Sequence, residues 1–188
     1  MAGADRWEDS VLGMLDDLEM QAEGLQLAER AVEVGELSVA QYAEVELVGR
    51  LHGSVGRSVR VGTLDGLELY GRLTAIGADW FLVSDQHGGI AFVPLTAVAV
   101  VDGLAASELP EAARPLTARL TLRSALRGLA EDRRPCTLHL RGGRTLSGNL
   151  IRVGADFAVI RQSGTGEQLT VPLAAIGVVR GRPEESSW

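Results

Sequence analysis

The sequence predicts an α+β protein that is mainly β, with two tandem five-stranded barrels, each preceded by a helix, and an acidic helical arm at the N-terminus. An internal repeat is the main observation behind this prediction: residues 66–83 recur as residues 143–160 at an offset of 77. Further along the chain, residues 93–98 recur as 171–176 at an offset of 78. Because the repeat is too long for a solenoid unit, we expect two copies of one small domain.

Strand-like patterns in each copy are the second observation. Five short runs per copy either alternate apolar and polar residues or are continuously apolar, as in short strands with a buried face. The glycines expected at hairpin turns and bends are Gly66, Gly71, Gly143 and Gly148. Pro94 and Pro172 have no amide hydrogen, so we expect each of them at the end of a strand. Short antiparallel strands with such bends are typical of a small, strongly curved barrel.

Helical patterns ahead of both copies are the third observation. Asp5 and Glu8 form a capping-box pattern, and residues 5–34 carry an amphipathic stripe, followed by a second helix that ends near Leu51. A helix is also expected over residues 118–130. The apolar arm residues that are candidates for binding a partner are Trp7, Val11, Leu15, Leu18 and Leu25. The alternative is that the two helices pack on each other as a hairpin within one chain. The predicted organisation is an arm of two helices at 1–53, a first barrel at 54–103, a linker at 104–117, a helix and second barrel at 118–182, and a tail at 183–188.

Charge is distributed unevenly along the chain. Residues 1–53 hold twelve acidic and three basic side chains, whereas residues 114–161 hold three acidic side chains and ten arginines. Three of these arginines recur every four residues and would share one helix face. The arginines that are candidates for contact with a nucleic acid or another anion are Arg119, Arg123, Arg127, Arg133, Arg134, Arg141, Arg144 and Arg152. The alternative is a solvated face, or pairing of these arginines with the acidic arm.

A helix followed by five bent strands, with Gly-x-Leu in the second strand and an aspartate before the third, resembles the Sm-like family, which includes the bacterial RNA chaperone Hfq. The residues that carry this resemblance are Gly66, Gly71, Leu73, Asp79 and Leu82, and Gly143, Gly148, Leu150, Asp156 and Val159. The resemblance implies an Sm-like barrel, a variant of the small SH3-like barrels, and RNA as a ligand. Trp80 and Phe157 stand where the family has an RNA-contacting asparagine. The overall layout also resembles an uncharacterised family of actinobacterial proteins.

Residues that could carry catalysis or bind a cofactor are sparse. Cys136 is the only cysteine, so an internal disulfide and a thiolate metal cage are both excluded. The three histidines have no metal-ligand spacing, and we expect neither a metal, nor a cofactor, nor a small-molecule substrate. Asp79 and Asp156 recur in both copies, and we expect their carboxylates to accept backbone N–H groups in turns.

The sequence therefore favours a non-catalytic interaction or scaffold protein, in which the barrels and the arm bind protein partners or a second copy of the chain. The first alternative is an RNA- or DNA-binding protein that uses the basic second module. An enzyme is the last alternative. The N-terminus lacks a signal-peptide layout, and no apolar run approaches the roughly 18 residues of a membrane span, so we expect a cytoplasmic protein without a membrane anchor.

Overall fold

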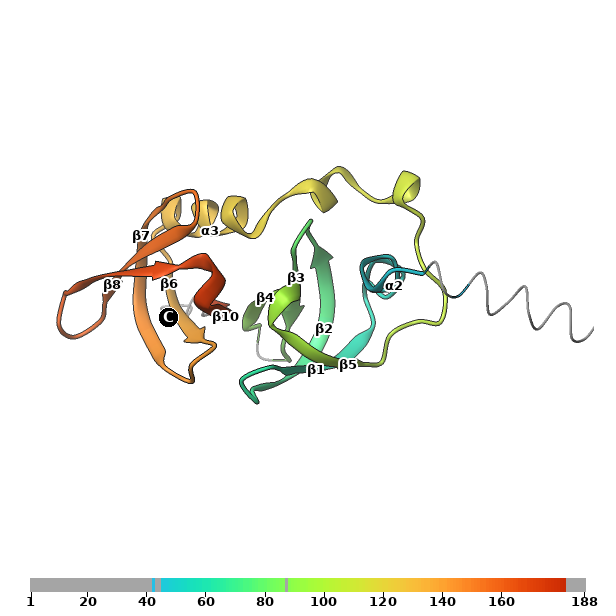
Figure 1. Ribbon diagram of the computed structural model, residues 1–188, viewed down its shortest axis with the longest axis horizontal. Coiled ribbons are helices and arrows are strands. Elements are labelled where there is room, and N and C mark those ends of the chain that lie inside the picture. Colours follow the sequence, from blue (N-terminus) through green and yellow to red (C-terminus); the bar gives the residue numbers. More distant parts are fainter. Residues whose placement is uncertain (1–41, 43–44, 87, 182–188) are drawn as a thin grey trace, which may run out of the picture. The chain divides into compact units, whose positions relative to one another are not determined.

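The computed structural model describes residues 42, 45–86 and 88–181 (Figure 1). Contacts divide the chain into residues 1–45 and 46–188, so residues 46–53, which we expected in the arm, group with the strands. The predicted helix over residues 5–34 lies outside the described residues. So do the arm residues expected to bind a partner, which are Trp7, Val11, Leu15, Leu18 and Leu25.

Ten antiparallel strands are the main regular elements of the described chain (Figure 1). The first five are β1 (Ser58–Thr63), β2 (Glu68–Ile76), β3 (Trp80–Ser84), β4 (Ile90–Pro94) and β5 (Val98–Asp102). The second five are β6 (Pro135–Leu140), β7 (Thr145–Val153), β8 (Phe157–Gln162), β9 (Gln168–Pro172) and β10 (Ile176–Gly181). Pro94 and Pro172 end β4 and β9, as the sequence predicted.

The prediction of two separate five-stranded barrels is wrong. The ten strands form one open sheet in the order β5-β1-β2-β3-β4-β10-β6-β7-β8-β9. Strand β10 pairs with β6 on one side and with β4 on the other, and this second pairing joins the two groups of strands. The sequence could not indicate this pairing, because strand pairing across two copies depends on edges that no local pattern specifies.

The two halves of the sheet, β1–β5 and β6–β10, nevertheless share one pattern of pairing. Val59 faces Gly71 in the first half, and Cys136 faces Gly148 at the corresponding position in the second. The register shifts in β2 and in β7 also fall at corresponding residues. A Cβ atom on Gly71 or on Gly148 would overlap the carbonyl oxygen of the adjacent strand, which explains why glycine stands within both strands.

Side chains cross the β4–β10 junction in both directions. Val178 of β10 is fully buried and packs in the apolar core of the first half. Trp80 and Phe92 of the first half pack in the core of the second half, with their ring centroids 5.2 Å apart. The Trp80 Nε1–H donates a hydrogen bond of 2.8 Å to the Leu120 carbonyl, so burial leaves its polar atom satisfied. The junction is therefore part of the core of both halves.

Two short α-helices cover the halves at corresponding places. Helix α2 (Leu47–Gly53) packs on β2, and α3 (Leu122–Glu131) packs on β7. The prediction of a helix from residue 118 is wrong by four residues: residues 116–119 form the 3-10 turn η3 (Leu116–Arg119), and the Thr121 hydroxyl caps α3 by accepting from Ser124 N–H. The carbonyl of Leu120 accepts from Trp80 and Ala78, which fixes the backbone before the helix.

The segment predicted as a linker, residues 104–117, is fixed to α2 by hydrogen bonds. The Arg50 guanidinium donates to the Ala105 carbonyl through Nε at 3.0 Å and through Nη2 at 2.9 Å. The Ser54 hydroxyl accepts from Ala105 N–H at 2.8 Å, and Leu109 N–H donates to the Gly49 carbonyl at 3.0 Å. Two 3-10 turns, η2 (Glu111–Ala113) and η3, complete the connection to α3.

Replacing Trp80 by alanine tests the importance of the junction. Trp80→Ala should lower the free energy of unfolding by about 3–5 kcal/mol, because it removes a buried indole. Phe157 is the repeat counterpart of Trp80 and is 39% exposed. Phe157→Ala should therefore cost less than about 2 kcal/mol. Urea unfolding followed by circular dichroism measures both variants, and equal losses would contradict a junction that belongs to the core.

Candidate interaction surfaces

The two ends of the sheet are open along the described chain. Strand β5 pairs only with β1, and β9 pairs only with β8. Their repeat counterparts, β10 and β4, pair with each other at the junction. An unpaired strand edge presents free backbone donors and acceptors to a further strand. The ends are therefore candidate interaction surfaces, which no pattern in the sequence indicates.

The β5 end exposes apolar side chains whose counterparts are buried at the junction. Val100 is 54% exposed, whereas its counterpart Val178 is fully buried. A valine exposed beside a free strand edge can add apolar contact to the backbone pairing of a bound strand. We call this surface, made of Val100 and the edge of β5, the β5 end.

The β9 end is more polar than the corresponding part of the junction. Phe157 is 39% exposed where Trp80 is 6% exposed. Thr170 is exposed at the position that corresponds to Phe92. Polar residues on an edge strand weaken unwanted strand pairing without preventing it. We call the surface made of Phe157, Thr170 and the edge of β9 the β9 end.

Three of the eight candidate arginines line one shallow pocket. Arg127, Arg133 and Arg152, together with Glu131, line a pocket of about 320 Å³ between α3 and β7. Arg127 Nε also donates to the Val153 carbonyl at 3.4 Å, which holds this side chain against the sheet. The excess of positive charge over the single carboxylate suits an anionic ligand. We call these residues the arginine pocket.

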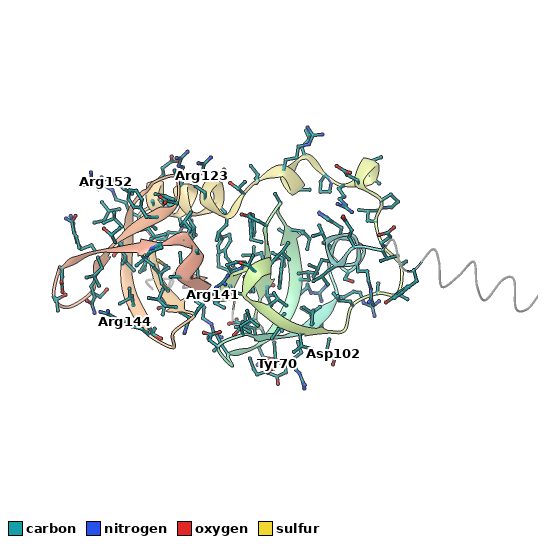
Figure 2. All side chains as sticks on the ribbon, in the orientation of Figure 1. Tyr70, Asp102, Arg123, Arg141, Arg144 and Arg152 are labelled. Atoms are coloured by element: carbon teal, nitrogen blue, oxygen red, sulfur yellow. The ribbon has the colours of Figure 1, made fainter. Side chains whose placement is uncertain are left out.

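The other candidate arginines do not join this pocket. Arg119 lies in η3 and therefore does not share a helix face with Arg123 and Arg127, which corrects that prediction. Arg141 donates to the Thr96 hydroxyl across the junction, and Arg134 lies 3.6 Å from the Asp132 carboxylate. Figure 2 shows Arg144 and Arg152 on opposite sides of the second half. The eight arginines therefore do not form a single surface.

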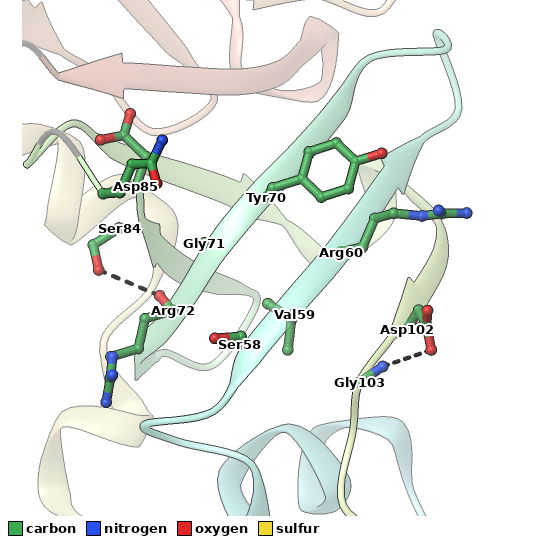
Figure 3. Close-up of a pocket in the computed structure, with 11 residues that line it drawn as sticks. Ser58, Val59, Arg60, Tyr70, Gly71, Arg72, Ser84, Asp85, Asp102 and Gly103 are labelled. Atoms are coloured by element: carbon green, nitrogen blue, oxygen red, sulfur yellow. Dashed lines mark hydrogen bonds between the residues drawn. The ribbon is translucent and has the colours of Figure 1, made fainter.

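An open hollow of about 830 Å³ lies on the first half (Figure 3). Arg60 and Arg72 line it together with Asp85 and Asp102, so its formal charges balance. Arg60 lies 3.7 Å from a carboxylate oxygen of Glu68, and Asp102 accepts from Gly103 N–H. Because its two arginines and two aspartates balance, this hollow has no excess charge to attract an ion.

Asp79 and Asp156 have different roles, although both lie in the same turn of the repeat. The Asp79 carboxylate accepts from Leu122 N–H at 2.6 Å, so it caps α3, an element distant in sequence, rather than its own turn. The backbone carbonyls of the two aspartates accept from corresponding leucines, Leu95 at 2.9 Å and Leu173 at 2.7 Å. Within the described chain the Asp156 carboxylate makes no hydrogen bond. We predicted that both carboxylates accept a backbone N–H within their own turns. Of the two, only the Asp79 carboxylate accepts a backbone N–H in the described chain, and its donor is Leu122 at the start of α3 rather than a residue of the turn.

The buried titratable groups favour their neutral forms. Burial raises the pKa of the Cys136 thiol to about 11, although a hydrogen bond from the Leu150 backbone opposes this shift. Burial, and then the nearby Arg114 guanidinium, lowers the pKa of His52. Burial lowers the pKa of His139, Arg180 lowers it further, and Asp65 opposes the shift. A protonated thiol is a poor nucleophile and metal ligand, so Cys136 is a packing residue.

Within the described residues, no group of three or more His, Cys, Asp or Glu side chains is placed to hold a metal ion. No helix in this part of the chain is both long and apolar enough to cross a bilayer. Comparison of the sequence with protein-family models gives no match, and comparison with curated proteins gives none either.

The contrast between the two aspartates gives a testable prediction. Asp79→Ala should lower the free energy of unfolding by about 1 kcal/mol, because Leu122 N–H at the start of α3 loses a charged acceptor. Asp156→Ala should change it by less than about 0.5 kcal/mol, as for an exposed side chain without a partner. Thermal unfolding of both variants measures the difference. Equal effects would show that the carboxylate of Asp79 does not stabilise α3.

Proposed function

We propose that this chain is a non-catalytic interaction protein that binds other polypeptides at the open ends of its sheet. The observation that carries the proposal is the contrast between the ends and the junction. Strands β5 and β9 have free edges in the described chain, while their repeat counterparts β10 and β4 pair with each other. Addition of a strand to a free edge gives affinity through backbone hydrogen bonds and specificity through alternate side chains.

The exposed side chains of the β5 end support this proposal. Three residues in the middle of β5 are apolar, and Val100 is 54% exposed. An added strand would cover this valine and satisfy the backbone groups beside it. The amphipathic helix predicted over residues 5–34, with Trp7, Val11, Leu15, Leu18 and Leu25 as its candidate contact residues, remains a second predicted surface for a protein partner.

A photo-crosslinking experiment tests the proposed function. A benzophenone amino acid in place of Val100 or Thr170 in the full chain should form covalent adducts with a second polypeptide in cells, because both positions lie at a free edge. Val55 is a matched control, since it is an exposed valine in the turn after α2. The same amino acid at Val55 should give no adduct. Absence of adducts from both edge positions, with the protein folded, would contradict the proposed function.

Nucleic-acid binding is a second candidate function, and the arginine pocket favours it. Three arginines around one hollow could contact neighbouring phosphates. The residues that line the pocket include no aromatic side chain for base stacking, so binding would depend on charge more than on sequence. Such binding would weaken steeply as salt increases.

Paired substitutions test this second candidate. The slope of log affinity against log salt is negative, and the double variant Arg127→Ala, Arg152→Ala should make it less steep by about 1.4–1.8. This change corresponds to two lost phosphate contacts. Fluorescence anisotropy with pooled RNA and DNA at low salt measures it. The control is Arg144→Ala with Arg161→Ala, which removes the same charge outside the pocket. No binding by the unmodified chain, or equal effects of both doubles, would contradict a nucleic-acid site in the arginine pocket.

A further inference from the structure

We infer that the partner at both ends of the sheet is a second copy of this chain, added head to tail so that β9 of one copy pairs with β5 of the next. This inference rests on the proposed function and names its partner. The argument comes from the β4–β10 junction, which shows how a first half and a second half of this repeat fit together. Within the described residues, each copy carries two strands, β5 and β9, whose outer edges correspond to the paired edges of this junction.

The junction predicts the register of the pairing between copies. Within one chain, Val179, Arg180 and Gly181 of β10 face Phe92, Ala91 and Ile90 of β4. Residues of β5 lie 78 positions before their counterparts in β10, and residues of β9 lie 78 positions after their counterparts in β4. The strand pairs within each half have the same register. The predicted pairs between copies are Val101 with Thr170, Asp102 with Leu169, and Gly103 with Gln168.

Exposed side chains at the two ends correspond to the side chains that cross the junction and pack in the core of the neighbouring half. Val178 enters the core of the neighbouring half, and its counterpart Val100 is 54% exposed. Trp80 enters the core of the neighbouring half in the other direction, and its counterpart Phe157 is 39% exposed. A second copy would bury both exposed residues in one contact, because one lies at each end of the chain.

Residues of opposite charge stand at the two ends of the sheet, Asp102 at the β5 end and Arg161 at the β9 end. Arg180 of β10 corresponds to Asp102 of β5, and Ser84 of β3 corresponds to Arg161 of β8. Arg161 lies beside Gln168 in the sheet, and Gln168 would face the residue after Asp102. The predicted register therefore brings an aspartate and an arginine from different copies close together, where opposite charges favour association.

Contact between copies would be weaker than the internal junction. Thr170 and Gln168 replace Phe92 and Ile90, so less apolar surface is buried. The contact is also heterologous, because β5 of one copy meets β9 of another. Head-to-tail contacts of this kind form closed rings or open chains rather than two-fold dimers.

Disulfide trapping tests both the partner and the register. Two full-length chains carry Cys136→Ala, one with Val101→Cys and the other with Thr170→Cys, and they differ in isotopic mass. Directly opposed residues of an antiparallel pair come close enough for a disulfide. Oxidation of the mixture should give mainly the mixed disulfide. A control carries Glu167→Cys in place of Thr170→Cys, so its cysteine is out of register with Val101→Cys. It should give at least about fivefold less of the mixed disulfide.

Sedimentation velocity over a concentration series gives an independent readout. The unmodified chain should associate reversibly, and Val100→Glu should raise the dissociation constant by about tenfold or more, because a buried carboxylate would replace an apolar contact. Val55→Glu is the matched control and should leave association unchanged. A monomer at every concentration, or a sample in which the Val101 and Thr170 cysteines form only same-site disulfides, would overturn the inference.

The outcomes separate this inference from the proposed function. If the photo-reactive group at Val100 forms adducts with other polypeptides but the chain does not associate with itself, head-to-tail pairing is wrong and the proposed function stands. If neither adducts nor self-association are found, both are wrong. Self-association that Val100→Glu does not weaken would overturn the inference by showing that copies meet at another surface, such as the arm.

Discussion

Pairing between β4 and β10 is the contact on which the rest of this structure depends. It joins two five-stranded halves into one sheet and lets each half place side chains in the core of the other. Trp80 and Phe92 would be exposed on an isolated first half, and Val178 on an isolated second half. Because each half buries apolar residues that belong to the other, neither half has a complete core of its own.

The segment that connects the two halves stabilises the same junction as the pairing of β4 with β10. Residues 104–121 run along α2 and reach the turn between β2 and β3, where Leu120 accepts hydrogen bonds from Ala78 and Trp80. Asp79 then caps α3, which covers the second half. The turn of the first half thus sets the start of a helix in the second, and this physical link explains why Asp79 and Asp156 have different surroundings.

Because the two halves are repeats of each other, the contacts of the junction indicate which residues at the ends of the sheet could make similar contacts. Each position at the junction has a counterpart at an end of the sheet, and the exposed counterparts include Val100 and Phe157. The arginine pocket lies between α3 and β7 and has no part in the junction. Binding of polypeptides at the ends and of an anion at the arginine pocket would therefore use separate surfaces, and a chain could do both.

The sequence alone determined the repeat, the strands and their bends. Gly66 and Gly143 have φ of +81° and +79° in the hairpin turns, as predicted, because only glycine adopts this conformation without strain. Tertiary structure alone decided that the ten strands form one sheet, and it separated the eight arginines that the sequence grouped. Local patterns fix which face of a strand is buried, whereas the partner of a strand edge depends on contacts between segments far apart in the chain. For the same reason, Trp80 and Phe157 look equivalent in the sequence, yet one is buried at the junction and the other is exposed.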